Sequence, residues 1–284
     1  MIKELFKPFK QFKLFNSFEL GKPNGANERK SVMTKIIFMN WSRWVFCRVV
    51  EVALIALLVG VPHETSFGQS ATSVSAMKIG IIGSGNIGST VGTLWVKAGH
   101  QVLFSSRNPQ NLKQLVDGLG PLARAGTVPE ALSFSDVVFI GVPYGAYPQI
   151  AKDYGKEFVG KIVLDAGNAV LARDGEIGKE AREKGVALTS ATLFAGARIV
   201  RAFNIMSFRK VVSNANRPEG RIAMPMAGDD QEALKVASGL VRDAGFDPVV
   251  VGSLQRSKLF EQGGPLYGAE MSAREMRERL KAMP

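Results

Sequence analysis

The chain has 284 residues, enough for one large or two small domains, and 46% of them are apolar, so it can bury a core. Ten basic and five acidic residues precede Met77, and the remainder carries +6 of the total net charge of +11. This basic excess suits a protein that binds phosphorylated cofactors. We find no zinc finger, helix-turn-helix or aromatic–basic repeat, so nucleic acid is not expected as a partner.

Cysteine and histidine are scarce, which restricts the chemistry. Cys47 and His63 both precede Met77, and His100 is the single histidine after it. The part after Met77 therefore has no internal disulfide, no Cys/His zinc site and no thiol nucleophile, and we predict no metal site. His100 lies in the turn between the first predicted helix and the second strand, where we expect a structural role.

Residues 1–76 form an N-terminal extension with a candidate signal peptide within 39–76. Arg43 and Arg48 precede an apolar stretch, residues 49–61, and small and polar residues follow it. The order basic, apolar, small is typical of a secretory signal, and export to the periplasm is favoured on this basis. The alternative is a cytoplasmic protein whose true start is Met77. The apolar run is too short for a membrane span, so none is predicted.

The segment 78–88 carries the most informative motif of the chain. Residues 78–82 are a continuous apolar strand, and the pattern G-x-G-x-x-G follows it and opens a helix over 86–98. Gly83 allows a sharp turn, Gly85 leaves room for a pyrophosphate, and Gly88 allows close packing of helix on strand. The helix start offers free N–H groups to the phosphates. We predict a dinucleotide pyrophosphate site at Gly83, Ser84, Gly85, Asn86, Ile87 and Gly88.

The end of the second strand, residues 101–104, indicates which dinucleotide binds. NAD sites usually have Asp or Glu there to accept hydrogen bonds from the ribose hydroxyl. This chain has Ser105, Ser106 and Arg107 instead. Hydroxyl groups and a guanidinium bind a 2′-phosphate, which a carboxylate would repel. The sequence therefore predicts NADP(H) as the cofactor.

Strand and helix patterns alternate over the rest of the chain. This alternation predicts an α/β fold with a doubly wound, mostly parallel sheet, a Rossmann-like domain over 77–255, and a C-terminal tail with a helix over 256–284. The further predicted strands are 137–142, 162–164, 198–203, 222–227 and 248–251. The further predicted helices are 109–119, a short helix to 134 opened by a capping box at Thr127–Glu130, 147–154, 175–184, 229–244 and 272–283, with a loop over 207–220.

A family resemblance covers residues 77 to about 259. The matching pieces, in order, are K-I-G-I-I-G-S-G-N-I-G at 78–88, F-S-S-R-N-P at 104–109, V-P-Y at 142–144, D-A-G-N at 165–168, R-A-F-N at 201–204, A-G-D-D at 227–230 and D-A-G-F-D-P-V-V-V-G at 243–252. The chain resembles the compact deazaflavin-dependent NADP oxidoreductases, which exchange hydride between NADP and coenzyme F420. It also resembles the cytosolic reductase domains of membrane metalloreductases.

The resemblance implies a place for the nicotinamide. In such relatives it lies near the loops after the fourth and fifth strands, which correspond to Val142, Pro143 and Asn168 here. Relatives often have Asn-Pro in the second of these loops, whereas this chain has Asn168-Ala169. The identity of the hydride acceptor is therefore not carried over from them.

The scarcity of proton donors also bears on function. Hydride transfer to a carbonyl normally needs a donor such as His, Lys or Tyr, whereas transfer to a flavin-like ring needs mainly positioning. Tyr144, Tyr147 and Asp165 remain as candidates, but each is better explained as structural, so no catalytic residue is assigned. We expect an NADP(H)-dependent oxidoreductase whose partner is F420, a flavin or another small acceptor. A homodimer is compatible with these observations. The alternatives are a non-catalytic NADP(H)-binding sensor module and a reductase of a small imine or carbonyl compound.

Overall fold

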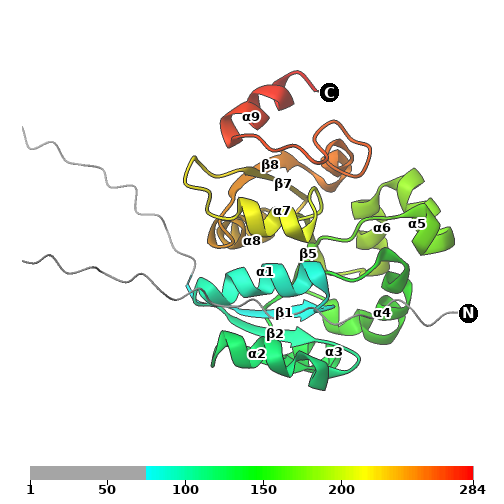
Figure 1. Ribbon diagram of the computed structural model, residues 1–284. Helices are drawn as coiled ribbons and strands as arrows, with labels where there is room; N and C mark the ends of the chain where they lie inside the picture. The colour runs from blue at the N-terminus through cyan, green and yellow to red at the C-terminus, as the bar shows by residue number, and fades with distance from the viewer. Residues whose placement is uncertain (1–74, 284) are drawn as a thin grey trace, which may run out of the picture. The chain divides into compact units, whose positions relative to one another are not determined.

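The computed structural model describes residues 75–283 (Figure 1). The candidate signal peptide and nearly all of the N-terminal extension lie outside this range. Among the described helices, none has the length and apolar character needed to cross a membrane.

The domain is built on one sheet of eight strands in the order β3-β2-β1-β4-β5-β6-β7-β8. The first six strands are parallel, whereas β7 runs antiparallel to β6 and β8 runs parallel to β7. This is the α/β, Rossmann-like fold that the sequence predicted. The strands are β1 (Lys78–Ile82), β2 (Gln101–Ser105), β3 (Ala123–Gly126), β4 (Val137–Ile140), β5 (Ile162–Asp165), β6 (Arg198–Arg201), β7 (Ala223–Gly228) and β8 (Asp247–Gly252).

Helices cover both faces of the sheet, and α1 and α7 lie side by side on one of them (Figure 1). The helices are α1 (Asn86–Lys97), α2 (Lys113–Leu119), α3 (Val128–Phe134), α4 (Tyr147–Tyr154), α5 (Leu171–Lys184), α6 (Val186–Leu193), α7 (Phe208–Asn214), α8 (Gln231–Asp243) and α9 (Ala273–Lys281). Short 3-10 turns add η1 (Pro109–Leu112), η2 (Tyr144–Ala146), η3 (Gly155–Phe158) and η4 (Leu254–Leu259).

The two faces have separate apolar cores because successive strand residues point to opposite sides. On the face of α1, Trp95 packs edge-on against Phe139 and Phe203, and its indole N–H donates to the carbonyl of Leu240 at 2.8 Å. On the face of α3 and α4, the strands contribute Val138 and other apolar residues to the second core. Burial on both faces explains why β4 reads as an unbroken apolar run.

The segment after residue 255 packs against the sheet. The N–H of Ala223 donates to the carbonyl of Met271 at 2.9 Å, and Leu266 and Met276 are fully buried. Glu261, also buried, accepts hydrogen bonds from the N–H groups of Val186 and Ala187 at 3.1 Å each. Its carboxylate thus caps the first turn of α6, where the helix dipole favours a negative charge.

His100 lies at the amino end of the sheet, as expected. Its Nδ1 accepts from the N–H of Met77 at 3.1 Å, and its Nε2 lies 3.0 Å from Asp243 Oδ2. The ring is buried and joins the start of β1 to the end of α8. This arrangement agrees with a structural role.

Three elements differ from the sequence predictions. The predicted loop over 207–220 is wrong, because residues 208–214 form α7, with the Ser207 hydroxyl accepting from the N–H of Lys210 and Val211 buried. Strand β3 was missed because its four residues show no apolar alternation, and pairing with β2 creates it. Helix α6 was missed because Val and Thr lower its helix propensity.

Some boundaries also move. Strand β4 ends at Ile140 and β6 at Arg201, each two residues before the predicted end, so Gly141 to Pro143 and Ala202 to Asn204 are loops. Helix α5 begins at Leu171, and Gly175 interrupts it with φ +60°, a conformation that a glycine adopts without strain.

Candidate dinucleotide site at the carboxyl edge of the sheet

The carboxyl ends of the parallel strands lie along one edge of the sheet, and the strand order reverses between β1 and β4. In open α/β sheets, ligands bind outside this edge at the point of reversal. The glycine-rich turn follows β1, and the loop Gly141 to Pro143 follows β4. The two touch, since a Cβ on Gly83 would collide with the Val142 side chain.

Each glycine of the motif has its own surroundings. Gly83 has φ +92°, which turns the chain out of β1. A Cβ on Gly88 would collide with the Gly83 carbonyl oxygen and lie 2.9 Å from Ile81 Cγ2, so α1 could not approach the sheet. A Cβ on Gly85 would meet nothing within 4 Å. The backbone at Gly85 is therefore open to a ligand, while the other two glycines serve packing.

The start of α1 offers donors without a competing acceptor. Gly85 is the N-cap and supplies no side-chain cap, and the first turn has no acidic residue. The N–H groups of Asn86 and Ile87 belong to the first turn, which has no partners within the helix. The hydroxyl of Ser84 is buried without a hydrogen-bond partner among the described residues. Such a donor set fits an anion.

The Ser-Ser-Arg segment after β2 divides into two parts. The Ser105 hydroxyl is buried and donates to the carbonyl of Ile81 at 2.7 Å, so it joins β2 to β1 and faces no ligand. The Ser106 hydroxyl oxygen accepts from the N–H of Asn108 at 3.1 Å and keeps its own hydrogen available. Arg107 is exposed, and the described residues offer it no ion pair. Ser106 and Arg107 are the groups placed to meet a 2′-phosphate.

The loops after β4 and β5 contain the remaining predicted residues. Val142 is half-buried, and Pro143 is exposed and accepts from the N–H of Ala146 at 3.0 Å. Asn168 is half-buried, and its amide joins two strands: Nδ2 donates to the carbonyl of Asn204 at 2.7 Å, and Oδ1 accepts from Arg201 Nη2 at 3.2 Å. Arg201 and Asn204 were not among the site residues predicted from the sequence, although Arg201 ends a buried strand and Asn204 follows it closely.

Tyr144 and Tyr147 lie beneath the loop after β5 and are fully buried. Their rings stack at 4.4 Å, and the Tyr147 hydroxyl donates to Asp165 Oδ1 at 2.7 Å. A Cβ on Gly167 would collide with the Tyr147 hydroxyl, so the ring supports the loop from below. Burial, and then the Asp165 carboxylate, raises the pKa of both tyrosines. They stay protonated and have the structural role expected of them.

Tyr144→Phe should leave NADPH binding and turnover nearly unchanged. The lost hydroxyl donates to the carbonyl of Val186 at 3.0 Å, which also accepts from Ser190, so we expect a stability loss of about 1 kcal/mol. Tyr144→Ala would open a core cavity and cost about 3–5 kcal/mol. Thermal unfolding and steady-state kinetics measure both effects. A well-folded Phe variant with a large fall in kcat would instead make this hydroxyl a proton donor.

One protein family matches the part of the chain that contains most of these residues. Residues 78–169 match the family described as NADP oxidoreductase, coenzyme F420-dependent. The match begins with β1 and includes the glycine-rich turn, the segment around Arg107 and Asn168. This part of the chain is therefore similar to that family.

Proteins similar to this chain include longer ones. The chain is 30% identical over 187 residues to rat metalloreductase STEAP3, a match that covers 66% of this chain and 36% of that protein. It is 23% identical over 183 residues to mouse metalloreductase STEAP2, covering 64% of this chain and 35% of that protein. The chain thus spans about a third of the length of these two relatives.

Solved structures support the fold. The hypothetical protein SMa0349 from Sinorhizobium meliloti is 27% identical with a TM-score of 0.62, and the match covers 70% of this chain and 96% of that one. A candidate F420-dependent NADP reductase from Arthrobacter sp. FB24 is 19% identical with a TM-score of 0.53, covering 64% of this chain and 87% of that one. At that identity the second likeness concerns the fold alone.

Proposed function

We propose that this domain is an NADP(H)-dependent oxidoreductase that exchanges hydride between NADP(H) and a planar ring acceptor, a flavin or the deazaflavin F420. The observation that carries the proposal is the open backbone at Gly85 beside the first-turn N–H groups of α1, which have no partner within the helix. Arg107, in the place of an acidic residue, supports NADP(H) over NAD(H).

The residues present fit this cofactor. The N–H groups of Asn86 and Ile87 would hold the pyrophosphate, beside the turn that contains Ser84. Arg107 and Ser106 would hold the 2′-phosphate. Bound NADP(H) supplies the hydride, and the loops after β4 and β5, with Val142, Pro143 and Asn168, would position the nicotinamide.

The choice of a ring acceptor rests on the proton donors near the site. Among the described residues, the three proton-donor candidates named from the sequence, Tyr144, Tyr147 and Asp165, are all fully buried. A flavin or deazaflavin ring accepts hydride with positioning as the main contribution of the protein. A ring acceptor therefore demands less of these residues than a carbonyl does.

The test has two stages. NADPH and NADH are first titrated by nicotinamide fluorescence, and tighter binding of NADPH is expected. NADPH oxidation is then followed with FMN, FAD and F420, and with small imines and carbonyl compounds. Turnover with a ring acceptor supports the proposal. Turnover with imines or carbonyls alone would overturn the acceptor class, and tight NADPH binding without turnover would leave a non-catalytic sensor module.

A further inference from the structure

Two opposite charges are buried side by side at the ends of β5 and β6. Asp165 and Arg201 pair in the strand register, and neither is accessible to solvent. Arg201 Nη1 lies 3.1 Å from Asp165 Oδ1 and also donates to the Asp165 carbonyl at 3.2 Å. The same carboxylate oxygen accepts from the Tyr147 hydroxyl and from the N–H of Gly167. One end of the guanidinium is thus fixed to β5.

Stability alone does not explain this pair. Removing two charges from water is costly, and well-packed apolar residues often stabilise a fold as well as a buried pair does. Three buried polar atoms here, Asp165 Oδ2, Arg201 Nε and Asn204 Oδ1, have no hydrogen-bond partner among the described residues. Such groups call for an explanation beyond packing.

The second arm of the guanidinium reaches Asn168. Arg201 Nη2 donates to Asn168 Oδ1 at 3.2 Å, and Asn168 Nδ2 donates to the Asn204 carbonyl at 2.7 Å. These two bonds fix which way the amide is turned and leave its second N–H without a partner among the described residues. Asn168 is also the one residue of 166–169 that is not buried. A ligand over this loop would meet that amide.

The second partner of the Asn168 amide, Asn204, follows a residue with an unusual backbone conformation. Phe203 has φ +61°, a conformation that bulky residues rarely adopt, and its ring is buried against Trp95 and Phe139. The Asn204 amide donates to the carbonyl of Phe260 at 2.9 Å. Strain of this kind persists where the surroundings over-determine it, often at ligand sites. The Asn204 carbonyl, which accepts from Asn168 Nδ2, is therefore held as firmly as the Arg201 guanidinium, which donates to Asn168 Oδ1.

We propose that Arg201 is a positioning residue for the nicotinamide end of NADP(H), acting through the Asn168 amide. The inference rests on the proposed function. Arg107 lies at the end of β2, on one side of β1, and Asn168 follows β5, on the other side. A dinucleotide whose 2′-phosphate lies at β2 and whose pyrophosphate lies at β1 extends its nicotinamide toward β4 and β5. The carboxamide oxygen there would accept from the free N–H of Asn168.

The test compares two ligands. NADPH has the nicotinamide end, and adenosine 2′,5′-bisphosphate has the 2′-phosphate but lacks that end. Arg201→Lys keeps a charge for Asp165 but loses the forked arm to Asn168. Loss of one hydrogen bond should weaken NADPH binding about fivefold to tenfold and leave the bisphosphate unchanged. Asn168→Ala should likewise weaken binding of NADPH and not of the bisphosphate. The double variant Arg201→Lys/Asn168→Ala should bind NADPH no more weakly than Asn168→Ala alone.

Arg198→Lys is the matched control, because Arg198 begins the same strand and forks onto Asp230 at 2.6 and 2.7 Å. It should change the affinity for neither ligand. If Arg201→Lys does not fold, the variant Asp165→Asn/Arg201→Met, which removes both buried charges, takes its place. It should weaken NADPH binding and leave binding of the bisphosphate unchanged, as expected for Arg201→Lys.

Unchanged NADPH affinity, or an equal loss for both ligands, would overturn the positioning role. Additive effects of Arg201→Lys and Asn168→Ala would also overturn it. Failure of the unmodified protein to bind either ligand would instead refute the proposed function.

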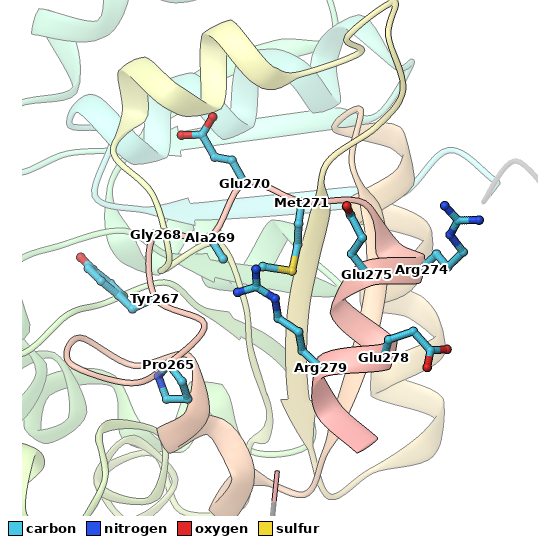
Figure 2. A pocket seen from close by; sticks show the side chains of 10 residues that line it. All are labelled: Pro265, Tyr267, Gly268, Ala269, Glu270, Met271, Arg274, Glu275, Glu278 and Arg279. Carbon is cyan, nitrogen blue, oxygen red and sulfur yellow. The ribbon is translucent and has the colours of Figure 1, made fainter. Parts of the chain in front are cut away.

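A cavity of about 780 Å³ lies elsewhere, between α9 and the segment before it (Figure 2). Its polar groups are largely engaged: Glu270 pairs with Lys210 at 2.6 Å, and Glu275 accepts from the N–H of Ser272 at 2.8 Å. Figure 2 shows Arg274 and Glu270 pointing away from one another, so the lining presents no convergent set of groups. It carries no proposal.

Discussion

Gly85→Val should abolish NADPH binding while the fold stays intact. A Cβ at this position meets no atom within 4 Å, and φ −76° with ψ −161° is a backbone conformation open to any residue. The branched side chain would fill the space over the first turn of α1, where the pyrophosphate must approach the backbone. Titration by nicotinamide fluorescence, with circular dichroism and thermal unfolding alongside, measures both parts of this expectation.

Two other glycines supply the controls. Gly118, in α2, also has nothing within 4 Å of a Cβ, so Gly118→Val should keep both the fold and NADPH binding. Gly88→Val should destabilise the protein, because its side chain would collide with the Gly83 carbonyl and contact Ile81. Normal NADPH binding by a folded Gly85→Val protein would mean that the glycine turn is structural.

Arg107→Ala should remove most of the preference for NADPH over NADH. A charged hydrogen bond to a phosphate contributes about 1.5–3 kcal/mol, so NADPH affinity should fall about tenfold or more while NADH affinity changes little. Because Arg107 is exposed, the difference should shrink as ionic strength rises. Parallel titrations of both cofactors at low and high salt test this.

Two further arginine substitutions separate the contribution of the Arg107 charge from that of its forked hydrogen-bond geometry. Arg107→Lys keeps the charge but loses the fork, and should give an intermediate preference. Arg277→Ala, which removes an exposed arginine from α9, should change neither affinity. Equal affinity of the unmodified protein for NADPH and NADH would contradict the assignment of the cofactor.

The sequence by itself predicted the features that depend on short stretches of chain. Strand β1 has the predicted bounds, because burial on both faces requires an unbroken apolar run. The capping box is confirmed, with Thr127 and Glu130 exchanging hydrogen bonds at the start of α3. The positive φ of Gly83 follows from the motif, since the turn from strand to helix needs it.

The tertiary structure decided whatever depends on a distant partner. Helix α6 has weak local propensity and is capped by Glu261, which follows Val186 by 75 residues. Ser105 resembled a phosphate ligand, but the adjacent β1 takes its hydroxyl. From the sequence, Arg201 was only a charged residue in a predicted strand. The register of β5 and β6 pairs it with Asp165 and lets it donate to Asn168. A side chain's partner across a parallel sheet depends on strand order and register, which bring together segments far apart in the sequence.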